Sequence, residues 1–213
     1  MTRPVADIAG TPATADTTDA SASTASWRTV DIIVAAALGV AFGVVFWGWN
    51  SFWNVLEPAF VGYPPGRAVI YGMWLVPAVL GALVVRKRGA AIFTEVVASV
   101  VSAVLGTPWG LYVVAYGAVE GAAAELVFAF ALYRSWRLPV ALGAGAAAGG
   151  AAALLDLAFY YPDWAVDHQV VYGLLVVGSS TLLAGLGSWL VVRALARTGV
   201  LAPFASGRDQ ARV

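Results

Sequence analysis

Four acidic side chains lie inside strongly apolar stretches of the chain, namely Glu95, Glu120, Glu125 and Asp156. A carboxylate near the middle of a bilayer costs about 2.5–3.5 kcal/mol on insertion scales, so each such residue is a candidate for function. The structural alternative is a neutral carboxyl group that hydrogen-bonds a neighbouring helix, because burial favours the uncharged form.

The spacing within residues 106–125 separates two of these acids. Tyr112, Tyr116 and Glu120 are four residues apart and therefore share one helical face. Glu125 lies five residues beyond Glu120, about 140° further round a helix that turns about 100° per residue. We expect Glu120 to bind a ligand below the two tyrosines, and we favour a helix-to-helix hydrogen bond for Glu125.

The other two acids allow more than one interpretation. Glu95 forms a polar stripe with Ser99 and Ser102 at helical spacing, and it can brace the bundle, line the floor of a pocket, or pair with the basic turn that precedes it. Asp156 shares a helical face with Tyr160, and ligand binding and a structural role remain equally open for it.

Aromatic residues gather in the segments expected at one surface of the membrane, above all in WGWNSFWN (47–54). An interfacial aromatic belt accounts for part of this enrichment. Three tryptophans in seven residues are denser than a belt requires, and planar side chains at a pocket mouth also suit a flat or cationic ligand. The candidate contacts beside the acids are Trp47, Asn50, Trp53, Trp74, Trp109, Tyr112, Tyr116 and Tyr160.

Signals for other chemistry are weak. The single histidine, His168, has no companion at metal-ligand spacing, and the chain contains no cysteine. A phosphate-binding loop and a serine nucleophile elbow are also missing from the sequence. We therefore predict no catalytic residue, no metal site and no cofactor, and we expect the chain not to be an enzyme.

The elements that must position these residues are membrane helices. The chain has 213 residues, of which 61% are hydrophobic and 11% charged, and its mean hydropathy is +0.81. These values are typical of an all-α integral membrane protein. Six apolar stretches predict a compact bundle of six transmembrane helices, at about 29–47, 69–85, 90–105, 111–132, 138–160 and 170–195.

The basic residues predict the orientation of this bundle. Eleven of the twelve lie before the first stretch, in two alternate turns, or after the last stretch, and only Arg67 lies on the other side. Both termini are therefore expected in the cytoplasm of a multi-pass protein of the cell membrane. We expect a disordered N-terminal tail at 1–27, a membrane domain at 28–200 and a cytoplasmic C-terminal tail at 201–213.

A stripe of small residues, Ala35, Gly39 and Gly43, follows one face of the first helix. Small residues let helices approach closely in lipid. The pattern fits packing inside the bundle and docking of another membrane protein equally well.

Several short motifs, taken in order, resemble the YkoE family of thiamine-related substrate-specific subunits, or S components, of energy-coupling factor (ECF) transporters. The resemblance covers about residues 28–205. It rests on YGMW (71–74), VRKRGAA (85–91) followed by Glu95, LGTPWG (105–110), EGAAAELVFA (120–129), YRSWRLP (133–139) and TGVL (198–201).

The resemblance implies a six-helix S component that captures thiamine or its hydroxymethylpyrimidine (HMP) precursor outside the cell. Its expected partners are a transmembrane coupling subunit, which the stripe Ala35, Gly39 and Gly43 would face, and two ATP-binding-cassette ATPases that hydrolyse ATP. The resemblance implies Gln at the position of Glu120, so the family pattern implies Glu125 as the ligand-binding acid, against the argument from helical facing.

Two other functions remain open at this point. One is an S component for another flat, nitrogen-rich vitamin. The other is a structural or assembly membrane protein whose acids only hold helices together. A membrane enzyme would need a nucleophile or a metal site, and the sequence offers neither.

Overall fold

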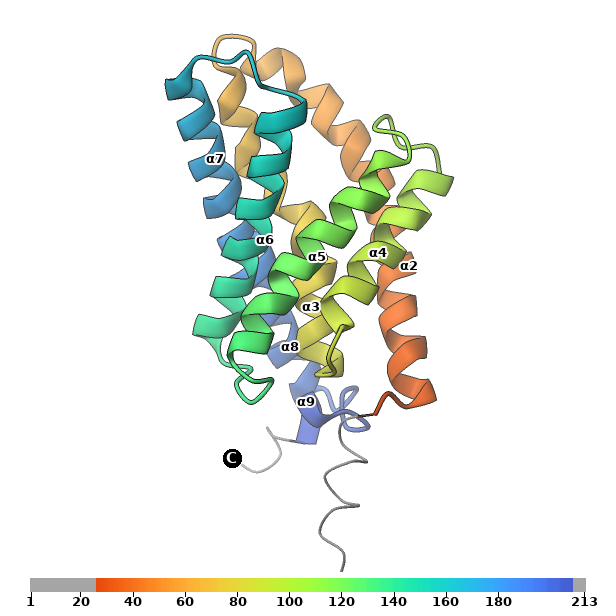
Figure 1. Ribbon diagram of the computed structural model, residues 1–213. Coiled ribbons are helices and arrows are strands. Elements are labelled where there is room, and N and C mark those ends of the chain that lie inside the picture. Colours follow the sequence, from red (N-terminus) through yellow and green to blue (C-terminus); the bar gives the residue numbers. More distant parts are fainter. Residues whose placement is uncertain (1–25, 209–213) are drawn as a thin grey trace, which may run out of the picture.

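The computed structural model describes residues 26–208, and within that range the protein is entirely helical, with no β-strand (Figure 1). Nearly all of the predicted tail at 1–27 and the last residues of the 201–213 tail lie outside the described range. In chain order the elements are α2 (Thr29–Leu56), η1 (Glu57–Phe60), η2 (Pro64–Leu75), α3 (Val76–Val85), α4 (Ala90–Val104), α5 (Tyr112–Phe130), α6 (Leu138–Phe159), α7 (Val166–Ser180), η3 (Thr181–Gly187), α8 (Ser188–Arg197) and α9 (Ala205–Arg208).

Five helical segments in the described range are long and apolar enough to span a membrane. They are Thr29–Phe60, Pro64–Val85, Tyr112–Phe130, Leu138–Phe159 and Val166–Arg197. The third predicted helix is the short one, as its sequence indicates, because α4 contains only 15 residues. The protein is therefore a multi-pass membrane protein, and α4 is a shorter apolar helix beside the five candidate spans.

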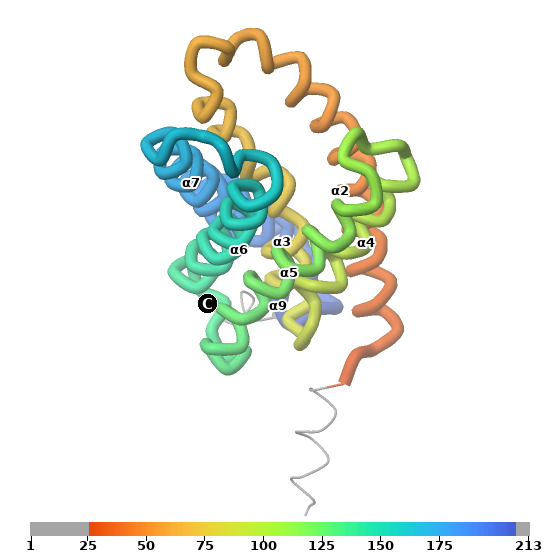
Figure 2. The backbone as a smooth tube through the Cα atoms, turned by 45° about the horizontal axis from the view of Figure 1, so that its top comes forward, coloured from red at the N-terminus to blue at the C-terminus, as the bar shows by residue number. Residues whose placement is uncertain are grey.

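Helix α2 is longer than the sequence predicts. We expected it to end near Trp47 and to lead into an outer connection at 48–68, but it continues to Leu56. The reason is that WGWNSFWNVL contains no proline, and the first one, Pro58, stands at the start of η1. Segment η1–η2 then crosses from α2 to the side of α7 (Figure 2), where η2 packs against that helix. The aromatic residues of 47–53 are thus held on a helix.

The second predicted helix, 69–85, is divided into a 3₁₀ segment, η2, and a short α-helix, α3. Pro77 stands in the first turn of α3, where a missing N–H costs least. A helix that begins inside the bundle leaves its first backbone N–H groups without intrahelical acceptors. One of these groups, on Ala78, donates to the Glu95 carboxylate at 2.8 Å.

The small-residue stripe of α2 is used inside the chain, which is one of the two uses that the sequence pattern left open. Ala35 is fully buried, and Gly39 and Gly43 lie directly against α4. A Cβ atom added at Gly39 would lie 2.6 Å from the Val97 side chain. At Gly43 it would collide with Val101. Close approach of α2 to α4 is therefore what these glycines provide.

The described chain begins and ends at the same end of the bundle, where α9 packs against α3 and α8 (Figure 1). Residues 201–208, which we expected to form a tail, pack against this end instead. Leu201 and Phe204 are buried, and the Ser206 hydroxyl donates to the carbonyl oxygen of Val84 at 2.9 Å. The Arg28 guanidinium forms an ion pair with the buried Asp31 in the same region, at 2.8 Å.

Candidate functional site

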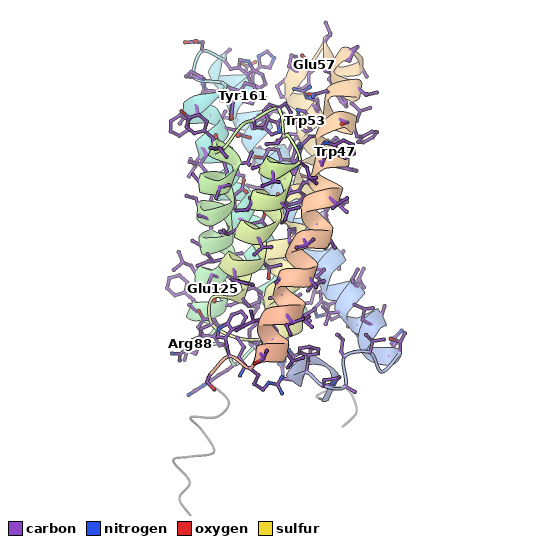
Figure 3. The ribbon with its side chains drawn as sticks, turned by 90° about the vertical axis from the view of Figure 1, so that its right-hand side faces the viewer. Trp47, Trp53, Glu57, Arg88, Glu125 and Tyr161 are labelled. Carbon is purple, nitrogen blue, oxygen red and sulfur yellow. The ribbon has the colours of Figure 1, made fainter. Side chains whose placement is uncertain are left out.

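A cavity of about 700 Å³, open solvent at its mouth included, lies among the helices. Residues of its wall lie at the end of the bundle that carries Trp53 and Tyr161, far from Arg88 and Glu125 (Figure 3). The lining residues are Phe46, Asn50, Trp53, Tyr71, Trp74, Glu95, Ser99, Ser102, Thr107, Trp109, Val113, Tyr116, Glu120, Asp156, Tyr160, Tyr161 and Tyr172.

Glu95 lies at the cavity wall and also braces the fold. Its Oε2 atom accepts the hydrogen bond from the Ala78 N–H, whereas its Oε1 atom is buried without a hydrogen-bond partner. The hydroxyl group of Tyr116, which also lines the cavity, is likewise buried and unpartnered. Buried polar atoms are nearly always paired in folded proteins. Two unpaired atoms at one cavity therefore indicate a place where a ligand or water completes the bonding.

Glu120 is the most available acid of the cavity. It is only 5% exposed, and it makes no hydrogen bond with any residue that the structure describes. No lysine or arginine lines the cavity either. An unpaired acid in a wall without basic residues favours a ligand that donates N–H groups or carries positive charge.

Asp156 is already partly engaged by the protein. Its Oδ2 atom accepts a hydrogen bond of 2.6 Å from the Tyr172 hydroxyl, and both side chains are buried at the cavity. The bond joins α6 to α7, so this acid has the structural role that we left open. Since Asp156 also lines the cavity, ligand binding stays open for it as well.

Asn50 lies at the centre of a hydrogen-bonded network in the cavity wall. Its side-chain nitrogen donates to Thr107 Oγ1 at 3.0 Å and to Ser102 Oγ at 3.4 Å. Its side-chain oxygen accepts from the indole N–H of Trp74 at 3.0 Å. Both hydrogens of the Asn50 amide and one acceptor position of its oxygen are therefore in use. Asn50 is thus better suited to hold Trp74 in place than to contact a ligand.

Several aromatic rings of the cavity walls pack edge to face. The Trp53 and Trp74 ring centroids are 5.0 Å apart, and those of Trp109 and Tyr160 are 6.1 Å apart. The Arg67 guanidinium carbon lies 4.3 Å from the Trp53 ring centroid, and Arg67 also pairs with Glu57 at 3.2 Å. Arg67, the basic residue that the sequence places apart from the others, thus supports one wall.

Nine of the predicted contact residues lie together at this cavity, and three do not. Trp47 is 50% exposed and Tyr112 is 76% exposed, and neither lines the cavity. Trp47 does not reach the cavity because it lies on a different face of α2 from Phe46, Asn50 and Trp53, which line the cavity. Glu125 is buried elsewhere. The nine are Asn50, Trp53, Trp74, Glu95, Trp109, Tyr116, Glu120, Asp156 and Tyr160.

Eight lining residues were missing from our prediction. For some the sequence does carry a signal, since Ser99 and Ser102 continue the stripe from Glu95, and Phe46 is one turn before Asn50. The sequence carries no such signal for Tyr71 and Tyr172, because these two residues reach the cavity only through the packing of η2 against α7. The others are Thr107, Val113 and Tyr161.

Glu125 joins two turns at the opposite end of the bundle. Its carboxylate accepts hydrogen bonds from the backbone N–H groups of Gly89 at 2.6 Å and Ala91 at 2.9 Å, and from the Tyr133 hydroxyl at 2.8 Å. Burial, followed by the hydrogen bond to Glu125 and its charge, raises the pKa of Tyr133 to about 12. Tyr133 thus remains a donor at neutral pH. We call this contact between turns 86–89 and 131–137 the Glu125 junction.

Each comparison with known proteins points to a membrane component of a transporter. Residues 30–151 match the family described as the permease component of an ABC-type cobalt transport system. The chain is 34% identical to a protein of Bacillus subtilis (strain 168) named as a candidate HMP/thiamine permease protein, YkoE, over 86% of this chain and 92% of that protein. A crystal structure of an S component of an ECF transporter superposes with a TM-score of 0.83 and 33% identity, covering 88% of this chain and 94% of the other.

Proposed function

The chain belongs to the YkoE-like family of ECF transporter S components, and we propose that it captures thiamine or HMP in the cavity described above. S components are not enzymes, so the work of this chain is to bind. The observation that carries the proposal is Glu120, a buried carboxyl group at the cavity with no hydrogen-bond partner among the described residues. Its setting suits a ligand that brings its own donors.

The two candidate ligands fit the chemistry of the wall. The aminopyrimidine ring that they share is flat and carries an exocyclic amine, which can donate to the free oxygens of Glu120 and Glu95. The thiazolium ring of thiamine is a flat cation, suited to tryptophan faces and to a wall without basic residues. We propose that Trp53, Trp74, Trp109, Tyr116 and Tyr160 form the stacking walls, while Glu120, with Glu95 and Asp156, takes the polar edge.

The proposal includes the setting in the membrane. All six apolar helices, including the short α4, would cross the bilayer, with both termini in the cytoplasm and the cavity opening outward. Support comes from the eleven basic residues that the sequence places on the side of the termini. A transmembrane coupling subunit and two ATP-binding-cassette ATPases would complete the importer and supply ATP-driven uptake. These partners would dock on a surface other than the buried stripe of Ala35, Gly39 and Gly43.

Affinity measurements on purified protein test the proposal. Thiamine and HMP should each bind with a stoichiometry of one, and Glu120→Ala should weaken both, since they share the amine-bearing ring. Affinity for a different flat, nitrogen-rich vitamin and none for these two would support the alternative S component. Absence of binding to any of them would favour a structural membrane protein.

A further inference from the structure

The Glu125 junction brings two basic turns together. Turn 86–89 contributes Arg88, and turn 131–137 contributes Arg134 and Arg137. The Arg88 guanidinium carbon lies 5.5 Å from the ring centroid of Tyr133, the residue next to Arg134. All three arginines are exposed, and none of them forms an ion pair with another described residue. The junction therefore brings into contact two turns that both carry exposed cations.

The acid at the centre of the junction does not neutralise these cations at the surface. Glu125 is only 7% exposed, and its two oxygens already accept three hydrogen bonds. These hydrogen bonds come from the turn at the start of α4 and from the Tyr133 hydroxyl group. An anion that approaches the junction from the solvent therefore meets the guanidinium groups before it meets the Glu125 carboxylate.

The backbone of the junction is held in an uncommon shape. In the described range, the non-glycine residues with positive φ are Arg86 at 55°, Leu132 at 53° and Tyr133 at 54°, and all three belong to these two turns. Such conformations are unfavourable for L-residues and persist only where surrounding contacts enforce them. Here the Tyr133 hydroxyl bonded to Glu125 is one such contact. These left-handed residues follow the ends of α3 and α5 and direct the chain into the two basic turns.

Large apolar side chains are exposed at the end of α5 and in turn 131–137. Phe130 is 84% exposed at the end of α5, and Leu132 is 64% exposed two residues later. Phe130 and Leu132 precede Arg134 in the chain by four and two residues. Exposed apolar residues next to guanidinium groups match an amphiphile whose hydrocarbon lies beside a negatively charged head. A purely aqueous acidic segment would leave Phe130 and Leu132 uncovered.

We propose that the Glu125 junction binds the phosphate headgroup of an anionic phospholipid. Arg88 and Arg134 would hold the phosphate oxygens from two sides, because the planar guanidinium group matches phosphate geometry and stays charged. Phe130 and Leu132 would contact the acyl chains. A zwitterionic lipid would bind more weakly, since its own ammonium group is repelled by the arginines. This site is separate from the cavity, so the proposal does not depend on which vitamin is carried.

Native mass spectrometry of the detergent-purified full chain tests this proposal, with phosphatidylglycerol or phosphatidylcholine added at equal concentration. The wild type should retain phosphatidylglycerol in preference. The double variant Arg88→Gln/Arg134→Gln should retain about tenfold less. The matched control is Arg193→Gln/Arg197→Gln, which removes the same charge from exposed positions of α8 and should retain lipid as the wild type does.

Three results would overturn the proposal. Equal retention of the two lipids would remove the selectivity for negative charge. Equal losses in both double variants would show diffuse attraction in place of a site. The variant Arg88→Gln/Arg134→Gln could also retain as much phosphatidylglycerol as the wild type and yet no longer co-purify with the coupling subunit and ATPases. That result would assign the surface to a protein partner. Circular dichroism checks the fold, and Arg134→Gln/Arg137→Gln replaces the first variant if that one fails to fold.

Discussion

Glu120 and Glu125 lie five residues apart on α5 and serve opposite ends of the protein. Glu120 lines the cavity without a hydrogen-bond partner in the described chain, whereas Glu125 accepts three hydrogen bonds at the junction of two turns. The helix tolerates two acids because neither faces lipid, and each has a different use. Replacing each acid in turn separates these uses by experiment.

Removing the Glu120 carboxyl group should weaken ligand binding. A hydrogen bond to a charged acceptor contributes about 1.5–3 kcal/mol, so Glu120→Ala should lower thiamine affinity about tenfold to a hundredfold in isothermal titration calorimetry. Glu120→Gln keeps one acceptor oxygen and should retain more of that affinity than Glu120→Ala. Unchanged affinity in Glu120→Ala would mean that this residue does not contact the ligand.

Removing the Glu125 carboxyl group should destabilise the fold and leave binding unchanged. Glu125→Ala loses three hydrogen bonds and leaves the N–H groups of Gly89 and Ala91 unpaired, which costs about 3–5 kcal/mol. The melting temperature in detergent should fall by several degrees. Thiamine affinity of the protein that remains folded should match the wild type. A large loss of affinity with an unchanged melting temperature would instead make Glu125 the ligand-binding acid, as the family pattern implied.

Replacing Asn50 should impair binding through Trp74. Asn50→Ala removes the acceptor of the Trp74 N–H, so the indole is free to turn and thiamine affinity should fall severalfold. In a double-mutant cycle with Trp74→Phe, which lacks that N–H, the two losses of affinity should not add. Additive losses would show that Asn50 acts on the ligand by another route.

The close contact between α2 and α4 predicts a packing defect. Gly43→Val places a branched side chain against Val101, and α2 must move outward. We expect a loss of about 1–3 kcal/mol of stability, visible as a lower melting temperature. Gly48→Val is the matched control, because a Cβ atom at Gly48 meets nothing within 4 Å. Equal melting temperatures for Gly43→Val and the control would argue against this packing.

Much of the architecture can be predicted from the sequence, because lipid leaves helices as the main solution for an apolar chain of this length. Helix ends are harder to predict. The aromatic density of 47–53 suggested a loop, whereas the lack of a helix breaker before Pro58 extended α2 through it. The division of 69–85 into η2 and α3 depends on Pro77 and on the Glu95 side chain, which accepts a hydrogen bond at the start of α3. Glu95 belongs to another helix, so this contact cannot be predicted from the sequence of 69–85 alone.

The candidate site shows the same division between local and long-range information. Spacing along α5 correctly placed Glu120 at the cavity, and the same spacing turned Glu125 away from it. Spacing cannot show which helix lies opposite, so Tyr71 and Tyr172 were missed. The stripe at Ala35, Gly39 and Gly43 was recognised as a contact surface, but only the packed structure shows that α4 occupies it.

The most direct test of the account is a titration of intrinsic tryptophan fluorescence in the purified protein with thiamine and with HMP. Trp53, Trp74 and Trp109 line the cavity, so a flat ligand among them should change the emission. We predict saturable quenching at submicromolar ligand in the wild type, and a curve shifted to higher concentration in Glu120→Ala. A flat response of the wild type to both compounds would contradict the central claim that this cavity binds them.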